Sequence, residues 1–320
     1  MNSELKSLIV IGGPTGVGKT DIAVDLARRC GGEIISADSM QVYRRLDIGT
    51  AKPTPSQCRG IPYHGIDFVE PPETFHLGAF IELADRLIAE IVTRGHRPLV
   101  VGGTGLYMKG LLQGVFDAPE VEPAIRKRLL ERVKSEGAPT LHAELARVDP
   151  NAAANISPND PIRITRALEV WEQTGRPISQ LWQESRAAES RYPYHLFVLT
   201  CERSVLYDRI NRRVEAMFRA GLADEVKRLV AEGVSPTCHA FKTLGYGHLL
   251  AWIEGRIGER EAIEEMQKHS RHYAKRQLTW FRAMSGAVWI DAGRRSVEEV
   301  AIEIERYVAS HEPLRENGEC

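Results

Sequence analysis

A glycine-rich turn with one lysine and one threonine is the first group of residues that could do chemistry. Residues 13–20 read G-P-T-G-V-G-K-T, which fits the phosphate-binding pattern G-x-x-x-x-G-K-[ST]. The N–H groups of such a turn and the positive end of the following helix bind phosphate oxygens. In this pattern Lys19 neutralises charge, and Thr20 can hold Mg²⁺. The turn therefore predicts a di- or triphosphate ligand, without naming a reaction.

Two more polar residues follow apolar runs that are typical of strands. Asp38 comes directly after residues 33–37, and Thr104 lies in the glycine turn after residues 97–101. Because ligands bind beyond the carboxyl ends of strands in an open parallel sheet, we expect Asp38 to face the phosphate loop. A capping role for Asp38 is the alternative. An ATPase or GTPase often has an acidic residue where Thr104 stands, so we expect that the phosphate is not hydrolysed.

Apolar runs and helical patterns alternate along most of the chain and must position these residues. The runs lie at 9–11, 33–37, 97–101, 195–200 and 287–291. Helical patterns lie at 78–93, at 203–229 as a helix pair broken at Gly221, and at 259–284. Residues 49–75 are rich in proline and glycine, so we predict loops over the active face, with only 66–69 resembling a strand. The fold class expected is α/β, a P-loop NTPase-like parallel sheet with flanking helices.

The segment 118–192 interrupts this alternation because it carries helical patterns alone. Helices are expected at 122–136, 140–148, 162–174 and 178–189, the third of them capped by Asp160 and begun by Pro161. We therefore predict a core from 1–117 and 193–310, an all-helical insertion domain at 118–192, and a disordered tail at 311–320. Arg163 and Arg166 could contact a phosphate backbone or belong to an ordinary solvated face.

A long helix near the carboxyl end combines an apolar stripe with a cationic face. From Lys268 to Arg282 there are five Lys or Arg and no acidic residue. The stripe predicted to pack is Ile263, Met266, Tyr273, Trp280, Phe281 and Met284, with Lys268, Arg271, Lys275 and Arg282 roughly opposite. Such a face suits phosphate contacts with RNA. Upstream, Arg209, Arg212 and Arg213 could complete a phosphate site or be solvated.

Composition bounds the remaining possibilities. The 320 residues are 43% hydrophobic and 27% charged, with a formal net charge of −1, which argues against bulk attraction to nucleic acid. Any RNA must therefore be held by local clusters. The five cysteines are scattered without a C-x-x-C pair, and no apolar run reaches the length of a membrane span. Since residues 1–7 are too short and polar for a signal peptide, we expect a soluble cytoplasmic protein.

Six stretches in order suggest a family. They are G-P-T-x-x-G-K-T at 13–20, D-S-M-Q-V-Y at 38–43, V-G-G-T-G-L-Y at 101–107, N-D-P-I-R-I-T-R-A-L-E-V at 159–170, L-G-Y at 244–246 and Y-A-K-R-Q-L-T-W-F-R at 273–282. From about residue 7 to 292 the chain resembles the tRNA dimethylallyltransferases, also called tRNA isopentenyltransferases. The resemblance implies transfer of a dimethylallyl group from dimethylallyl diphosphate to the exocyclic amine of the adenosine just 3′ of the anticodon, in tRNAs reading codons that begin with U.

The resemblance also implies roles for individual residues. Asp38 is the expected general base, Thr104 lies beside the tunnel where the substrates meet, Lys19 and Arg213 bind the diphosphate, and Thr20 helps place the cofactor Mg²⁺. The diphosphate site is expected at Gly13, Pro14, Thr15, Gly16, Val17, Gly18, Lys19, Thr20 and Arg213. Contacts with tRNA are expected at Asp38, Ser39, Met40, Gln41, Thr104, Ile162, Arg163, Ile164, Thr165, Arg166, Phe241, Lys242, Thr243, Leu244, Gly245, Lys275, Arg276 and Arg282. We expect a monomer.

The chain departs from the family pattern at three of these places. Lys242 and Gly247 stand where the family often has arginines, and Ile162 stands where it often has glutamine. Three other functions remain open on the residues alone. They are a P-loop kinase of small molecules, a non-catalytic nucleotide-dependent RNA switch, and an adenylate isopentenyltransferase, the last being disfavoured because it has no need of the 118–192 insertion.

Overall fold

The computed structural model describes residues 7–114, 122–186, 190–242 and 246–312. The chain divides into two compact units, and each is described by itself. One unit comprises Met1–Leu111 with Tyr192–Cys320, and the other comprises Leu112–Arg191.

The first unit is built on a six-stranded sheet. The strands in spatial order are β3 (Tyr63–His64), β2 (Gly32–Ser36), β4 (Arg97–Val101), β1 (Leu8–Gly12), β5 (Tyr194–Thr200) and β6 (Val288–Asp291). All neighbouring strands are parallel, with Val10 opposite both Val100 and Leu196. The predicted α/β parallel sheet is confirmed. Because the strands are parallel, the loops that follow β1, β2 and β4 leave from one edge.

Residues 66–69, the one stretch within the predicted loops that resembles a strand, form no strand. The chain forms β3 at Tyr63–His64 instead, and Val69 makes only an isolated bridge with Tyr43. Of this segment only Val69 is buried, whereas Phe68 is 39% exposed.

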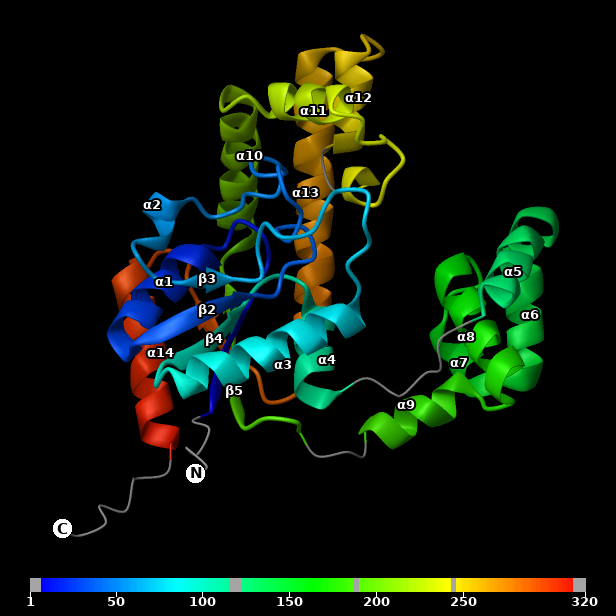
Figure 1. Ribbon diagram of the computed structural model, residues 1–320, viewed down its shortest axis with the longest axis horizontal. Helices are drawn as coiled ribbons and strands as arrows, with labels where there is room; N and C mark the ends of the chain where they lie inside the picture. Colours follow the sequence, from blue (N-terminus) through cyan, green and yellow to red (C-terminus); the bar gives the residue numbers. More distant parts are fainter. Residues whose placement is uncertain (1–6, 115–121, 187–189, 243–245, 313–320) are drawn as a thin grey trace. The chain divides into compact units, whose positions relative to one another are not determined.

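Helices cover both faces of the sheet (Figure 1). The crossovers from β1 to β2 and from β3 to β4 run in opposite directions, so right-handed connections place α1 (Lys19–Cys30) and α3 (Leu77–Thr93) on opposite faces. The last helix, α14 (Val297–His311), packs beside α1 over a shared apolar core. It was not among the expected helices.

Four helices extend beyond the carboxyl edge of the sheet. They are α10 (Arg203–Arg219), α11 (Leu222–Ala231), α12 (Tyr246–Ile253) and α13 (Glu259–Arg282). The predicted break at Gly221 is confirmed, since this residue has φ 91° and caps α11. Helices α10 and α13 run side by side, as Figure 1 shows. Short helices α2 (Pro55–Cys58), α4 (Gly105–Gln113) and η1 (Ala240–Lys242) complete this unit.

The described residues of the second unit form helices alone. These are α5 (Pro123–Glu136), α6 (Ala138–Val148), α7 (Pro150–Asn155), α8 (Pro161–Thr174) and α9 (Ile178–Arg186). They share their own apolar core, which includes Leu129, Leu141 and Leu168. The predicted cap is confirmed, because the Asp160 carboxylate accepts the Arg163 N–H at 3.1 Å. The helix α7 was not predicted. The predicted boundary at 117/118 lies outside the described residues.

The end of the chain differs in part from the predicted tail. His311 is the last residue of α14, and Glu312 pairs with Arg97, so the prediction is wrong for these two residues. Residues 313–320 lie outside the described part. Among the helices that the structure describes, none combines the length and apolarity needed to cross a membrane.

Candidate active site

A cavity of about 1050 Å³ opens at the carboxyl edge of the sheet, entirely within the first unit. Its lining includes the glycine turn from Thr15 to Thr20, the turn from Asp38 to Gln41, and the loop from Asp47 to Thr54. Arg213 of α10 and Tyr273 of α13 close its other side. The structure thus brings the predicted phosphate loop, the predicted base and the predicted arginine into one site.

The glycine turn has the backbone of a phosphate loop. Gly18 caps α1 with φ 101°, a left-handed conformation that favours glycine. Lys19 follows it, and its Nζ donates to the carbonyls of Gly13 and Pro14, both at 2.9 Å. Burial lowers the pKa of Lys19 to about 7, opposed by the Asp38 carboxylate and assisted by the Arg213 guanidinium. Lys19 is therefore only partly charged near neutral pH until an anion approaches.

The three arginines of α10 have three different environments. Arg213 points at the phosphate loop, where its Nη1 donates to Thr15 Oγ1 at 3.4 Å. Burial lowers its pKa, and Asp38 opposes that effect. Arg209 instead donates to the carbonyls of Val17 and Gly293, and Arg212 is exposed and pairs with a neighbouring carboxylate. Of the three, Arg213 is the one placed to meet a phosphate.

Asp38 is half-buried where the chain leaves β2. Its Oδ1 accepts the N–H groups of Met40 at 2.9 Å and Gln41 at 3.3 Å, which is the capping arrangement of an Asx turn. Among the described residues, no donor reaches its Oδ2. One oxygen thus fixes the orientation of the carboxylate and the other is available for a proton, so the two alternatives considered for Asp38 are compatible.

Thr104 ties the ends of β2 and β4 together. Its N–H donates to the Ala37 carbonyl at 3.2 Å, and its Oγ1 accepts the Ser39 N–H at 3.1 Å. A Cβ at Gly102 would lie 2.1 Å from the Ala37 oxygen, so only glycine permits this approach. Thr104 is therefore bound to the same turn that carries Asp38.

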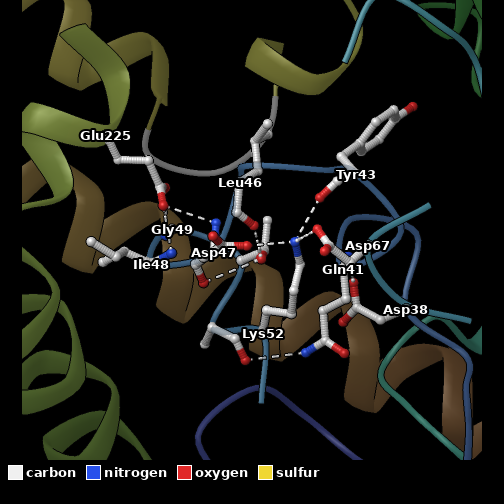
Figure 2. Close-up of polar contacts among 12 residues, drawn as sticks. Asp38, Gln41, Tyr43, Leu46, Asp47, Ile48, Gly49, Lys52, Asp67 and Glu225 are labelled. Atoms are coloured by element: carbon white, nitrogen blue, oxygen red, sulfur yellow. Dashed lines mark hydrogen bonds and ion pairs between the residues drawn. The ribbon is translucent and has the colours of Figure 1, made fainter. Parts of the chain in front are cut away.

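The loop over the cavity is held by one buried carboxylate (Figure 2). Glu225 of α11 accepts the N–H groups of Asp47 and Ile48 at 2.8 Å each and that of Gly49 at 3.2 Å. It also accepts the Tyr246 hydroxyl at 2.6 Å. Charge-assisted bonds of this kind are stronger than neutral ones. A helix distant in sequence thus fixes one wall of the cavity.

A lysine holds the same loop from the other side. Lys52 Nζ donates hydrogen bonds to the Tyr43 carbonyl at 2.8 Å, the Asp47 carboxylate at 2.5 Å and the Asp67 carboxylate at 2.6 Å (Figure 2). Gln41 Nε2 donates to the Ala51 carbonyl at 3.2 Å, which links this loop to the Asp38 turn. The wall and the turn are therefore one hydrogen-bonded assembly.

The cationic face predicted on α13 is confirmed in part. Lys275, Arg276 and Arg282 are exposed, and no carboxylate of the described chain pairs with them. Lys268 does pair with Glu265, and Arg271 donates to Asn211 of α10 at 2.6 Å. The remaining free cations therefore lie in the carboxyl-terminal half of the helix.

One member of the apolar stripe was placed wrongly. Trp280 is 39% exposed, whereas Phe281 and Met284 are buried. Tyr273 is half-buried at the cavity, where burial, with a contribution from Asp38, raises its pKa. The inward face is completed by Ala274 and Gln277, which the predicted stripe did not include because it contained only large apolar residues.

Not every predicted tRNA contact has an available side chain. In the second unit Ile162 is 81% exposed and Arg163 is exposed, but Ile164 and Thr165 are buried. Their side chains pack inside that unit. Phe241 is likewise buried. The side chain of Lys242, and all of Thr243, Leu244 and Gly245, lie outside the described residues.

Comparison with known proteins agrees with this geometry. Residues 41–284 match the family described as IPP transferase, and residues 6–63 match isopentenyl transferase. The chain belongs to the IPP transferase family. A tRNA dimethylallyltransferase of Geobacter sulfurreducens is 46% identical over 89% of this chain and 91% of its own length. One from Geobacillus thermodenitrificans is 44% identical over 98% of this chain and 99% of its own.

Solved structures of IPP transferases share the fold. The tRNA isopentenylpyrophosphate transferase of Bacillus halodurans superposes with a TM-score of 0.72 at 42% identity, covering 95% of this chain and 96% of the other. A eukaryotic dimethylallyltransferase described as acting on tRNA superposes with a TM-score of 0.81 at 28% identity, covering 98% of this chain and 81% of the other.

Sequence reasoning missed several residues that shape this IPP transferase site. Glu225 follows Gly221-Leu222 on α11, in a segment read only as one half of a helix pair. Gln277 stands within the Y-A-K-R-Q-L-T-W-F-R stretch, where the cations alone were singled out. Both are polar residues at buried helical positions, and that mismatch with the binary pattern is the signal that could have found them.

Proposed function

We propose that this chain transfers a dimethylallyl group from dimethylallyl diphosphate to the exocyclic amine of the adenosine 3′-adjacent to the anticodon, in tRNAs reading codons that begin with U. The observation that carries the proposal is the shared cavity, where Lys19 and Arg213 meet Asp38. The names of the relatives support the same activity. On this proposal the glycine turn holds a diphosphate leaving group.

The reaction divides between the two sides of the cavity. A bond forms between the amine nitrogen and C1 of the dimethylallyl group as the C1–O bond to diphosphate breaks. The electron pair of that bond leaves with the diphosphate, where turn N–H groups, Lys19 and Arg213 stabilise the developing charge. The amine proton passes to the Asp38 Oδ2, the carboxylate oxygen without a donor. A neutral aromatic amine is a poor nucleophile, so this proton acceptor is needed.

We propose Mg²⁺ as the cofactor and Thr20 as its protein ligand. Thr20 lines the cavity in the first turn of α1, and the described residues contain no cluster of His, Cys, Asp or Glu that could hold a metal by itself. This donor set fits an ion held largely by phosphate oxygens and water, as Mg²⁺ prefers. When bound, Mg²⁺ neutralises part of the leaving-group charge.

We propose that RNA is held by the exposed cations of α13 and, in the second unit, by Arg163 and Arg166. The target adenine has to leave its stack, at a cost of roughly a few kcal/mol that is least in a single-stranded loop. An anticodon loop meets this condition. The monomeric state and cytoplasmic location expected from the sequence stay predictions.

Transfer of label from dimethylallyl diphosphate to unmodified tRNA tests the proposal. We expect labelled isopentenyladenosine at the position 3′ of the anticodon and stoichiometric diphosphate release. Adenosine monophosphate as acceptor is the matched control, because residues 6–63 also match isopentenyl transferase. Labelling of free nucleotide without tRNA labelling would favour an adenylate isopentenyltransferase. ATP consumption that does not depend on tRNA would favour a kinase, and RNA binding without turnover would favour a non-catalytic switch.

A further inference from the structure

A buried carboxamide on α13 joins the two sides of the cavity. Gln277 is 4% exposed, although it follows the exposed Arg276 on the cationic helix. Its Oε1 accepts the Thr15 N–H at 2.8 Å, and its Nε2 donates to the Gly103 carbonyl at 3.0 Å. Both polar ends are therefore used within the protein. The side chain points inward, away from the face offered to RNA.

The two backbone groups that Gln277 binds begin the two functional turns. Thr15 lies at the start of the phosphate loop and its Oγ1 accepts a hydrogen bond from Arg213. Gly103 immediately precedes Thr104, which is bound to the Asp38 turn. A single side chain thus spans from the diphosphate side to the side of the proton acceptor.

The requirements on this side chain are unusually specific. One end must accept a hydrogen bond and the other must donate one, which a carboxamide does and a carboxylate or an alkyl chain of the same length does not. The carboxamide also requires space at Gly103, because a Cβ there would lie 2.1 Å from Gln277 Nε2. The approach of backbone to carboxamide therefore accounts for a glycine at 103.

We propose that Gln277 is a positioning residue, which holds the phosphate loop against the turn after β4 so that diphosphate and acceptor amine meet in reactive geometry. The inference rests on the proposed function, and extends it to a cavity-lining residue whose two polar ends are bound within the protein. Misplacement of reacting groups by about 1 Å can cost about a hundredfold in rate. Because the same helix carries Lys275 and Arg276, the RNA-binding surface and the phosphate loop are held by one rigid element.

The first test is Gln277→Met, which keeps side-chain length and removes both hydrogen bonds. We expect single-turnover transfer at saturating substrates to fall about ten- to a hundredfold, and the Kd for inorganic diphosphate to rise about three- to tenfold. Affinity for tRNA and its salt dependence should stay parental. Gln267→Met is the matched control on α13, because Gln267 is half-buried and bonds α10 at 3.4 Å but does not line the cavity. Gln267→Met should leave the single-turnover rate and the Kd for inorganic diphosphate unchanged.

The second test is Gln277→Glu, which separates the two bonds. An ionised carboxylate still accepts the Thr15 N–H but repels the Gly103 carbonyl, whereas the protonated form restores the donor. Its transfer rate, divided by that of the parent at each pH, should therefore recover as the pH falls. This pH profile does not follow from a loss of packing, and it remains informative if Gln277→Met folds poorly.

Each outcome decides the matter. Parental transfer and diphosphate binding by Gln277→Met would overturn the proposal, as would a pH-independent rate ratio for Gln277→Glu. Weaker tRNA binding with a parental rate at saturation would make Gln277 an RNA contact instead. If the parent itself transfers nothing, the proposed function fails, while the inorganic diphosphate measurement still tests the link between Gln277 and the phosphate loop.

Discussion

At the scale of residues, the site is arranged around cations that lack a close ionic partner. Among the described residues no carboxylate forms an ion pair with Lys19 or Arg213, and burial lowers the pKa of both. A buried cation without a partner is unfavourable by itself and becomes favourable when an anion arrives. The site is thus electrostatically prepared for a diphosphate before any ligand binds.

The first prediction concerns Lys19 and pH. Its pKa is about 7 in the free protein, and a bound diphosphate must raise it. Binding therefore takes up a proton, so affinity is full below pH 7 and is lost as the pH rises from about 7 towards the pKa of the complex. We expect the Kd for dimethylallyl diphosphate without tRNA to increase by up to about tenfold per pH unit in that window, measured by calorimetry.

Lys19→Arg is the control for this measurement. Arginine stays charged across the whole range, so its Kd should vary only with the titration of the ligand, which the two proteins share. The same pH slope in both proteins would show that Lys19 does not titrate in this window.

The second prediction concerns Asp38→Asn. Asparagine keeps the shape and can still accept the bonds that orient the turn, but it cannot accept a proton. We expect parental binding of both substrates and a loss of single-turnover transfer of about a hundredfold or more, the scale on which positioned general bases contribute.

Variation of Mg²⁺ separates the other roles of Asp38. Recovery of much of the activity in excess Mg²⁺ would make Asp38 a metal ligand. Near-parental transfer would reduce it to a cap and leave the proton acceptor to be found elsewhere.

At the scale of elements, the two faces of α13 make different contacts. Its exposed cations, of which Arg276 also lines the cavity, are available for RNA, while its inward side chains contact the phosphate loop. The buried positions Met266, Ala274, Gln277 and Phe281 anchor it in the first unit. The helix is therefore a rigid support and not a detachable basic arm.

The third prediction is that Lys275→Ala with Arg276→Ala weakens tRNA binding and flattens its salt dependence. Each lost phosphate contact removes about 0.7 to 0.9 from the log–log salt slope, so the double variant should lose about 1.5. Lys275→Ala alone should leave binding of dimethylallyl diphosphate unchanged, because Lys275, unlike Arg276, is not among the residues that line the cavity. The matched control is Arg260→Ala, since Arg260 is an exposed cation on the same helix and lies roughly 22 Å away along its axis. An unchanged slope in the double variant would contradict the assignment.

At the scale of the whole molecule, the two ends of the helical unit lie next to each other. The Arg191 N–H donates to the Leu112 carbonyl at 2.9 Å, and the Ser190 hydroxyl donates to the same carbonyl at 3.1 Å. Because the two ends of this unit meet, the chain can pass from α4 to β5 without it. An insertion of this kind has its own core and is a candidate for removal.

The fourth prediction is that replacing residues 115–189 by a short Gly-Ser linker leaves a folded first unit. Circular dichroism and a cooperative thermal transition should persist, and binding of dimethylallyl diphosphate should stay near parental. Transfer to tRNA should fall, because Arg163 and Arg166 are removed. Loss of all folded structure would instead make the helical segment part of the core.

The sequence by itself determined the features that depend on neighbours in the chain. The phosphate loop, the Asp160 cap, the break at Gly221 and the strands that carry Asp38 and Thr104 all follow from local spacing and from hydrophobic period. Parallel order then implied that those residues share one edge. The family resemblance added the reaction and the choice of Arg213.

Only the tertiary structure decided which side chains hold the site together. Thr15 and Gln277 lie 262 positions apart, and Asp47 and Glu225 lie 178 apart, so no local pattern links them. The tertiary structure also decided that Arg213 faces the phosphate loop, whereas Arg209 binds backbone carbonyls and Arg212 pairs with a carboxylate. It also left Trp280 exposed. A buried hydrogen-bond donor or acceptor without a partner is costly, so each of these polar groups must find one when distant segments pack. Which partner it finds depends on the packing, and neither composition nor hydrophobic period predicts it.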